Sequence, residues 1–94
     1  MLTESMEDYL EMIYRLTTTK GYVRVMDLAE ALNVQPSSVT RMIQKLGEEG
    51  FVCYEKYRNI ALTERGAAIG RFLVWRDQTL RDFLTLLKAR AGVK

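Results

Sequence analysis

Residues 25–46 read VMDLAEALNVQPSSVTRMIQKL, two short helical patterns separated by a turn. In each pattern, apolar residues recur at positions i, i+3, i+4 and i+7, the spacing of one helix face. They are Val25, Leu28, Ala29 and Leu32 in the first pattern, and Val39, Met42, Ile43 and Leu46 in the second. Asn33 tolerates the left-handed conformation that ends many helices, and Pro36 suits the first position of the next helix. Two helices joined by so short a turn predict a helix-turn-helix.

The segments on either side extend this motif to a known architecture. An amphipathic helix is predicted over residues 3–19, followed by a short β-rich stretch at residues 22–24. Residues 51–55 and 59–62 are rich in β-branched and aromatic residues and predict a hairpin, and a long helix follows Thr63, a good N-cap. The predicted fold class is mainly α with a small β-hairpin: a winged helix-turn-helix with a long C-terminal helix.

The predicted long helix carries a heptad-like row of apolar residues, here called the seam. The seam comprises Ile69, Leu73, Leu80, Phe83 and Leu87, and is interrupted only by Arg76. Such a seam needs a partner surface. We therefore expect residues 1–75 to form the winged helix-turn-helix DNA-binding domain and residues 76–94 to be a dimerization segment.

Composition narrows the function. The 94 residues, 48% hydrophobic and 28% charged, are typical of one globular domain, and no apolar run approaches the roughly 20 residues that cross a bilayer. The N-terminus is acidic and does not resemble a signal peptide, so a cytoplasmic location without membrane contact is expected. The chain has no histidine and a single cysteine, Cys53, which excludes the Ser-His and Cys-His nucleophile pairs and the common zinc ligand sets. An enzymatic function is not expected, and no catalytic residue is predicted.

The net charge of +2 is too small to identify a nucleic-acid partner, so the positions of the charges are more informative than their sum. On a helical wheel, Ser37, Arg41 and Gln44 lie opposite the apolar stripe, flanked by Thr40 and Lys45. Arginine can contact guanine, glutamine can contact adenine, and serine or threonine can bond to base edges or phosphates. Any surface helix has a polar face, but the preceding helix and the basic hairpin favour DNA binding.

The predicted DNA contacts fall into two groups. Base recognition is assigned to Ser37, Ser38, Thr40, Arg41 and Gln44, and phosphate binding to Lys45, Lys56, Tyr57 and Arg58. The last three form the expected wing tip, for which the alternative is a solvent-exposed turn with no partner.

The first helix offers a second kind of site. Asp8, Glu11 and Arg15 fall on the face opposite its apolar stripe, and two carboxylates at i, i+3 could bind a hard divalent cation. The spacing alone favours a solvated face with a Glu11–Arg15 ion pair.

Three stretches, SMEDYLE at residues 5–11, QPSSVTRMIQKL at 35–46 and YEKYR at 54–58, resemble the manganese-responsive repressors related to the diphtheria toxin repressor. The similarity covers essentially the whole chain. It implies a homodimer that reads a pseudo-palindromic double-stranded operator of manganese- or iron-homeostasis genes, with metal as corepressor.

The same resemblance implies that Asp8 and Glu11 are metal ligands. Family members carry a histidine ligand near the position of Asp77, and further ligands in a C-terminal dimerization domain beyond Lys94. Asp8, Glu11 and Asp77 could still form an oxygen-only site suited to Mn²⁺. Binding of Mn²⁺ by these three carboxylates is expected to be weak or absent, and Asp77 alternatively is a solvated or salt-bridged residue.

A different class of function stays open at this point. The chain could be a winged-helix protein-interaction module, or a truncated paralogue that dimerizes with a full-length repressor through the seam. The salt dependence of binding distinguishes these functions, because DNA binding weakens steeply with added salt and apolar association does not.

Overall fold

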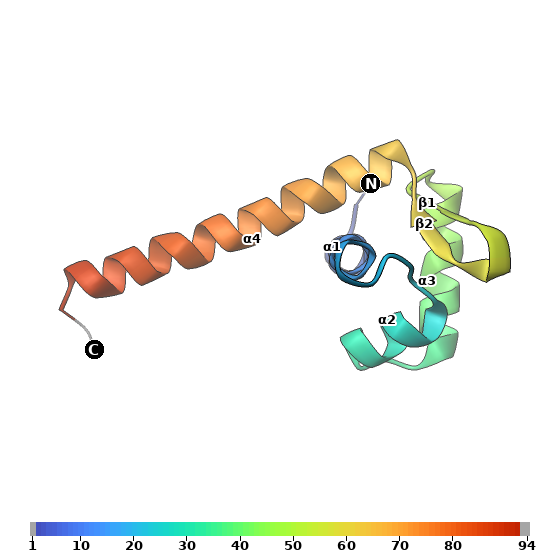
Figure 1. Ribbon diagram of the computed structural model, residues 1–94, viewed down its shortest axis with the longest axis horizontal. Coiled ribbons are helices and arrows are strands. Elements are labelled where there is room, and N and C mark those ends of the chain that lie inside the picture. The colour runs from blue at the N-terminus through green and yellow to red at the C-terminus, as the bar shows by residue number, and fades with distance from the viewer. Residues whose placement is uncertain (1, 93–94) are drawn as a thin grey trace.

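The computed structural model describes residues 2–92, and its helices and strands follow the predicted order (Figure 1). They are α1 (Glu4–Lys20), α2 (Val25–Leu32), α3 (Pro36–Glu48), β1 (Val52–Tyr54), a 3-10 turn (Lys56–Arg58), β2 (Ile60–Leu62) and α4 (Glu64–Arg90). The mainly α winged helix-turn-helix fold with a long C-terminal helix is therefore confirmed.

The helices begin and end where local chemistry predicts. The hydroxyl of Thr3 accepts a hydrogen bond from the amide of Met6 at 3.1 Å, and the hydroxyl of Thr63 does the same for Gly66 at 3.1 Å. Asn33 closes α2 in the left-handed conformation, with φ of 55°. These caps depend on neighbours within a few residues, which is why the sequence specifies them.

The core lies where α1, α2, α3 and the hairpin meet. Its largest fully buried side chains are Leu10, Ile13, Val23, Leu28, Val39, Ile43 and Leu46. Every buried position of α2 and α3 belongs to the predicted apolar stripes. Burial of this face turns the opposite face of α3 toward solvent.

The hairpin is shorter than predicted. Only three residue pairs connect the antiparallel strands, Val52↔Leu62, Cys53↔Ala61 and Tyr54↔Ile60. The predicted β-rich stretch at residues 22–24 forms no strand, but the carbonyl of Val23 accepts a hydrogen bond from the amide of Ile60 at 2.7 Å. This bond fixes the base of the hairpin to the segment between α1 and α2.

Helix α4 contacts the rest of the chain only along its first half. At Gly66 an added Cβ would lie 2.0 Å from the carbonyl oxygen of Phe51, so only glycine permits this approach. From Gln78 to Gly92 every residue is exposed, and α4 projects from the domain in Figure 1. The Cα radius of gyration is 15.3 Å, against about 12 Å for a compact chain of this length. Within residues 2–92 no helix has the length and apolar character to span a membrane.

Candidate nucleic-acid interface

The exposed face of α3 is the first part of the candidate interface. All six predicted residues of this helix are exposed: Ser37, Ser38, Thr40, Arg41, Gln44 and Lys45. The Thr40 hydroxyl donates to the carbonyl of Pro36 at 3.2 Å, which leaves its oxygen able to accept. The side chains of Arg41, Gln44 and Lys45 make no hydrogen bond or ion pair within residues 2–92. Their donors and acceptors are therefore available to an external partner.

The charge of α3 is distributed unevenly along the helix. Its first turn contains no acidic residue, and the positive end of the helix dipole lies there. Glu48 and Glu49 lie at the opposite end. An anion is thus favoured at the N-terminal half of α3, the half that helix-turn-helix proteins place against DNA bases.

The hairpin tip is the second part of the candidate interface. Lys56, Tyr57 and Arg58 are all exposed, and 81% of the Tyr57 surface is accessible. Tyr57 and Arg58 both have φ of 61°, a backbone conformation that is uncommon for residues other than glycine and asparagine. The Arg58 guanidinium lies 5.3 Å from the centre of the Tyr54 ring, a cation–π contact that orients it. The tip lies beside α3 in Figure 1.

One contact that couples the hairpin to the helix-turn-helix was not predicted. The Nε of Arg24, the N-cap residue of α2, donates to Oδ1 of Asn59 at 3.1 Å. The backbone amide of Arg24 donates to Oδ2 of Asp27 at 2.8 Å, which caps α2. Arg24 and Asn59 are 35 positions apart, so no local sequence signal predicts the first contact.

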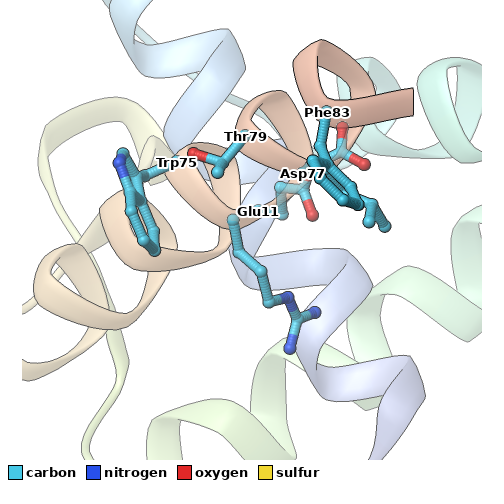
Figure 2. Close-up of a pocket in the computed structure, with 7 residues that line it drawn as sticks. Glu11, Trp75, Asp77, Thr79 and Phe83 are labelled. Carbon is cyan, nitrogen blue, oxygen red and sulfur yellow. The ribbon is translucent and has the colours of Figure 1, made fainter. Parts of the chain in front are cut away.

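The predicted metal ligands lie apart from this interface, on α1 and α4. Glu11 and Asp77 line a hollow of about 630 Å³ together with Trp75, Leu80 and other residues of α4 (Figure 2). Asp8 is exposed, and its side chain makes no hydrogen bond or ion pair within the described chain. No three His, Cys, Asp or Glu side chains between residues 2 and 92 are grouped so as to hold a metal ion.

A guanidinium stands between the two carboxylates that do approach each other. Nη2 of Arg15 lies 2.9 Å from Oε2 of Glu11 and 3.1 Å from Oδ2 of Asp77. The Glu11–Arg15 ion pair that the spacing favoured is thus present. The residues as arranged do not fit a bound Mn²⁺, because one oxygen of each carboxylate already binds Arg15, and its positive charge lies between the two groups.

The two-helix motif, the hairpin and the solvent-facing polar side of α3 together define a winged helix-turn-helix protein. The N-terminal DNA binding domain of the iron dependent repressor family matches residues 1–60, and the chain belongs to this family.

Relatives and solved structures agree with this assignment. The HTH-type transcriptional regulator MntR of Bacillus subtilis (strain 168) is 54% identical over 87 residues, which are 93% of this chain and 61% of the relative. MntR of Geobacillus thermodenitrificans is 55% identical over 87 residues, with 93% and 62% covered. The chain thus spans about three fifths of the length of these relatives.

Among solved structures, T. acidophilum IdeR is 33% identical with a TM-score of 0.62, over 70% of this chain and 30% of that one. Lactococcus lactis ZitR, at 22% identity, has a TM-score of 0.73 over 92% of this chain and 59% of its own. The second likeness concerns the fold alone.

Proposed function

We propose that this protein is a sequence-specific double-stranded DNA-binding transcriptional repressor that controls manganese- or iron-homeostasis genes. The observation that carries the proposal is the exposed, acid-free N-terminal part of α3, whose Arg41, Gln44 and Lys45 have no partner within the described residues. The basic hairpin tip beside it supplies the second contact that a winged helix makes. Membership of the iron dependent repressor family, and the description of MntR as an HTH-type transcriptional regulator, support a metal-related repressor.

Each group of residues has a role in this proposal. Ser37, Ser38, Thr40, Arg41 and Gln44 contact base edges in the major groove, and Lys45, Lys56, Tyr57 and Arg58 hold phosphates. No residue has a catalytic role, since recognition of DNA requires none.

The proposed partner besides DNA is a second copy of the chain. Seven large apolar side chains of α4 are exposed: Phe72, Trp75, Leu80, Phe83, Leu84, Leu86 and Leu87. A patch of this kind marks an interaction surface. We assign the DNA-binding domain to residues 1–75 and dimerization to residues 76–94, of which 93 and 94 lie outside the described part. A two-fold dimer would read half-sites about 34 Å apart, or a multiple of that distance.

The arrangement of the candidate metal ligands does not favour control of DNA binding by a metal ion. Asp8, Glu11 and Asp77 remain the proposed oxygen ligands should Mn²⁺ bind, but Arg15 occupies the space between two of them. We therefore propose that DNA binding by this chain depends weakly or not at all on Mn²⁺.

Fluorescence anisotropy tests the function. The chain is titrated into a labelled duplex that bears a palindrome of the family's type and into a scrambled duplex, each with Mn²⁺ or with a chelator. We expect preference for the palindrome with or without Mn²⁺, and a steep loss of affinity as salt rises, with a slope of about −0.9 for each phosphate contact in a log–log plot. Equal, salt-insensitive binding to both duplexes would favour a protein-interaction module instead.

A further inference from the structure

The junction between α1 and α4 is a charge-balanced network. Glu7 and Glu11 of α1 and Asp77 of α4 each face an arginine, at distances between nitrogen and oxygen of 2.9 to 3.6 Å. The pairs are Glu7–Arg76, Glu11–Arg15, Asp77–Arg15 and Asp77–Arg81. Three carboxylates thus meet three guanidiniums, and no negative charge among them is left for a metal ion to neutralise.

Arg15 differs from the other two arginines because it contacts two carboxylates, one on each helix; Arg76 also joins the helices, but through the single contact with Glu7 at 3.6 Å. Its Nε and Nη2 both donate to Oε2 of Glu11, at 3.2 and 2.9 Å, and Nη2 also donates to Oδ2 of Asp77 at 3.1 Å. It therefore bonds to the carboxylates of both helices through one nitrogen. Arg81 bonds to Asp77 within α4 itself, and its side chain is 69% exposed.

Two properties of this arrangement oppose a divalent ion. A carboxylate ligates Mn²⁺ through oxygen lone pairs, and those of Glu11 Oε2 and Asp77 Oδ2 already accept hydrogen bonds from Arg15. Both oxygens face the same guanidinium, that of Arg15. An ion placed there would also lie beside the positive charges of Arg15 and Arg81.

We propose that Arg15 is a built-in replacement for the metal ion: it ties α1 to α4 through Glu11 and Asp77, and the chain does not take up Mn²⁺ at these carboxylates. Because α1 also packs against the helix-turn-helix core, the arrangement of α4 relative to α3 is set without a metal. The inference deepens the proposed metal-independent repressor, and it is tested without DNA so that the two can fail separately.

The first measurement uses the unmodified protein. The electron paramagnetic resonance signal of free Mn²⁺ is recorded as protein is added, and the melting temperature is measured with and without about 1 mM MnCl₂, the concentration at which weak oxygen-ligand sites fill. We expect no loss of the free Mn²⁺ signal and no change in melting temperature. Stoichiometric loss of the signal at micromolar Mn²⁺, or a rise of several degrees, would overturn the inference.

The second measurement uses Arg15→Gln, with Arg81→Gln as the matched control because it also removes a guanidinium from Asp77 but leaves the bridge between the helices. Arg15→Gln should lower the melting temperature by about 2–6 °C, and about 1 mM MnCl₂ should restore part of the loss. Arg81→Gln should change neither value. Equal losses in the two variants, or no response of Arg15→Gln to Mn²⁺, would contradict the replacement. If Arg15→Gln does not fold, the Mn²⁺ titration of the unmodified protein still decides.

Discussion

Arg41 has no partner in the described chain and lies on the exposed face of α3, so its substitution probes DNA contact rather than stability. Arg41→Ala should weaken binding to the palindrome by about 5- to 150-fold and reduce the preference for it over the scrambled duplex, the loss expected of one bidentate base contact. Anisotropy with both duplexes measures this. Arg71→Ala removes an exposed arginine of α4 and is the control. A uniform loss on both duplexes would mean that Arg41 contacts only the backbone.

Asp27 links the end of α1 to the start of α2, and its pKa gives a testable pH dependence. A hydrogen bond from Lys20 at 2.7 Å, and then the amide of Arg24, lower the pKa of Asp27 below its usual value, while partial burial opposes this shift. A carboxyl whose pKa is lower in the folded chain stabilises it above the unfolded pKa of about 3.9, and this stabilisation is lost as pH falls through the folded value.

Asp27→Asn should therefore be less stable at pH 7, by up to about 1 kcal/mol for a partly exposed pair, and the difference should vanish in acid below the folded pKa. Urea unfolding from pH 7 to pH 2 measures the difference between the two proteins. Parallel curves over the whole range would show that Asp27 does not contribute.

The contacts of individual residues divide into those the sequence predicts and those it does not. The caps at Asn33 and Thr63 were predicted because a cap and its partner lie within one turn. The Glu11–Arg15 pair is local for the same reason. Arg15 and Asp77 are separated by 62 positions, and their contact depends on how α1 crosses α4. Helix periodicity does not specify that crossing.

At the scale of single elements, the helices were predicted better than the hairpin. The apolar stripes of α2 and α3 extend over several turns, whereas each strand has only three residues, too few for a pattern to set its ends. The conformation of the hairpin tip was not predictable either. Tyr57 and Arg58 are left-handed, and neither is a glycine or asparagine, the residues that usually indicate such a turn. The exposure of the tip and the basic character of Lys56 and Arg58 followed from the sequence, but the backbone conformation of Tyr57 and Arg58 did not.

The packing of α4 on the hairpin depends on Gly66. Gly66→Ala should destabilise the fold by about 1–3 kcal/mol or more, because the new Cβ would meet the backbone carbonyl of Phe51 at 2.0 Å. Gly47→Ala is the control: its Cβ would meet the carbonyl of Val52 at 3.8 Å, ordinary contact, so it should be neutral or stabilising by up to about 1 kcal/mol. Chemical denaturation of both variants measures the difference. Equal stabilities would show that α4 can shift away from the hairpin at little cost.

At the scale of the whole molecule, the predicted seam of α4 serves two purposes. Leu73 is buried in the chain's own core and Ile69 packs against that core, while Leu80, Phe83 and Leu87 are each about half exposed. The periodicity is continuous through the helix, so it could not show where contact with α1 ends. That end lies near Asp77, beyond which every described residue is exposed.

The exposed part of the seam predicts a dimer that Phe83→Glu would disrupt. A glutamate at this position would place a charge in the apolar contact, so the variant should sediment as a monomer at concentrations where the unmodified chain is a dimer. Thr85→Glu is the control, because Thr85 lies on the opposite side of the exposed helix.

Loss of the dimer also has a consequence for DNA. Two linked DNA-binding domains bind a palindrome with an affinity that can exceed that of one domain by about 100-fold or more. Phe83→Glu, although remote from α3, should therefore lose about that factor on the palindrome and little on a single half-site. Sedimentation equilibrium and anisotropy on both duplexes measure these quantities. A monomeric unmodified chain at high concentration would mean that α4 does not pair, and that this domain binds each half-site alone.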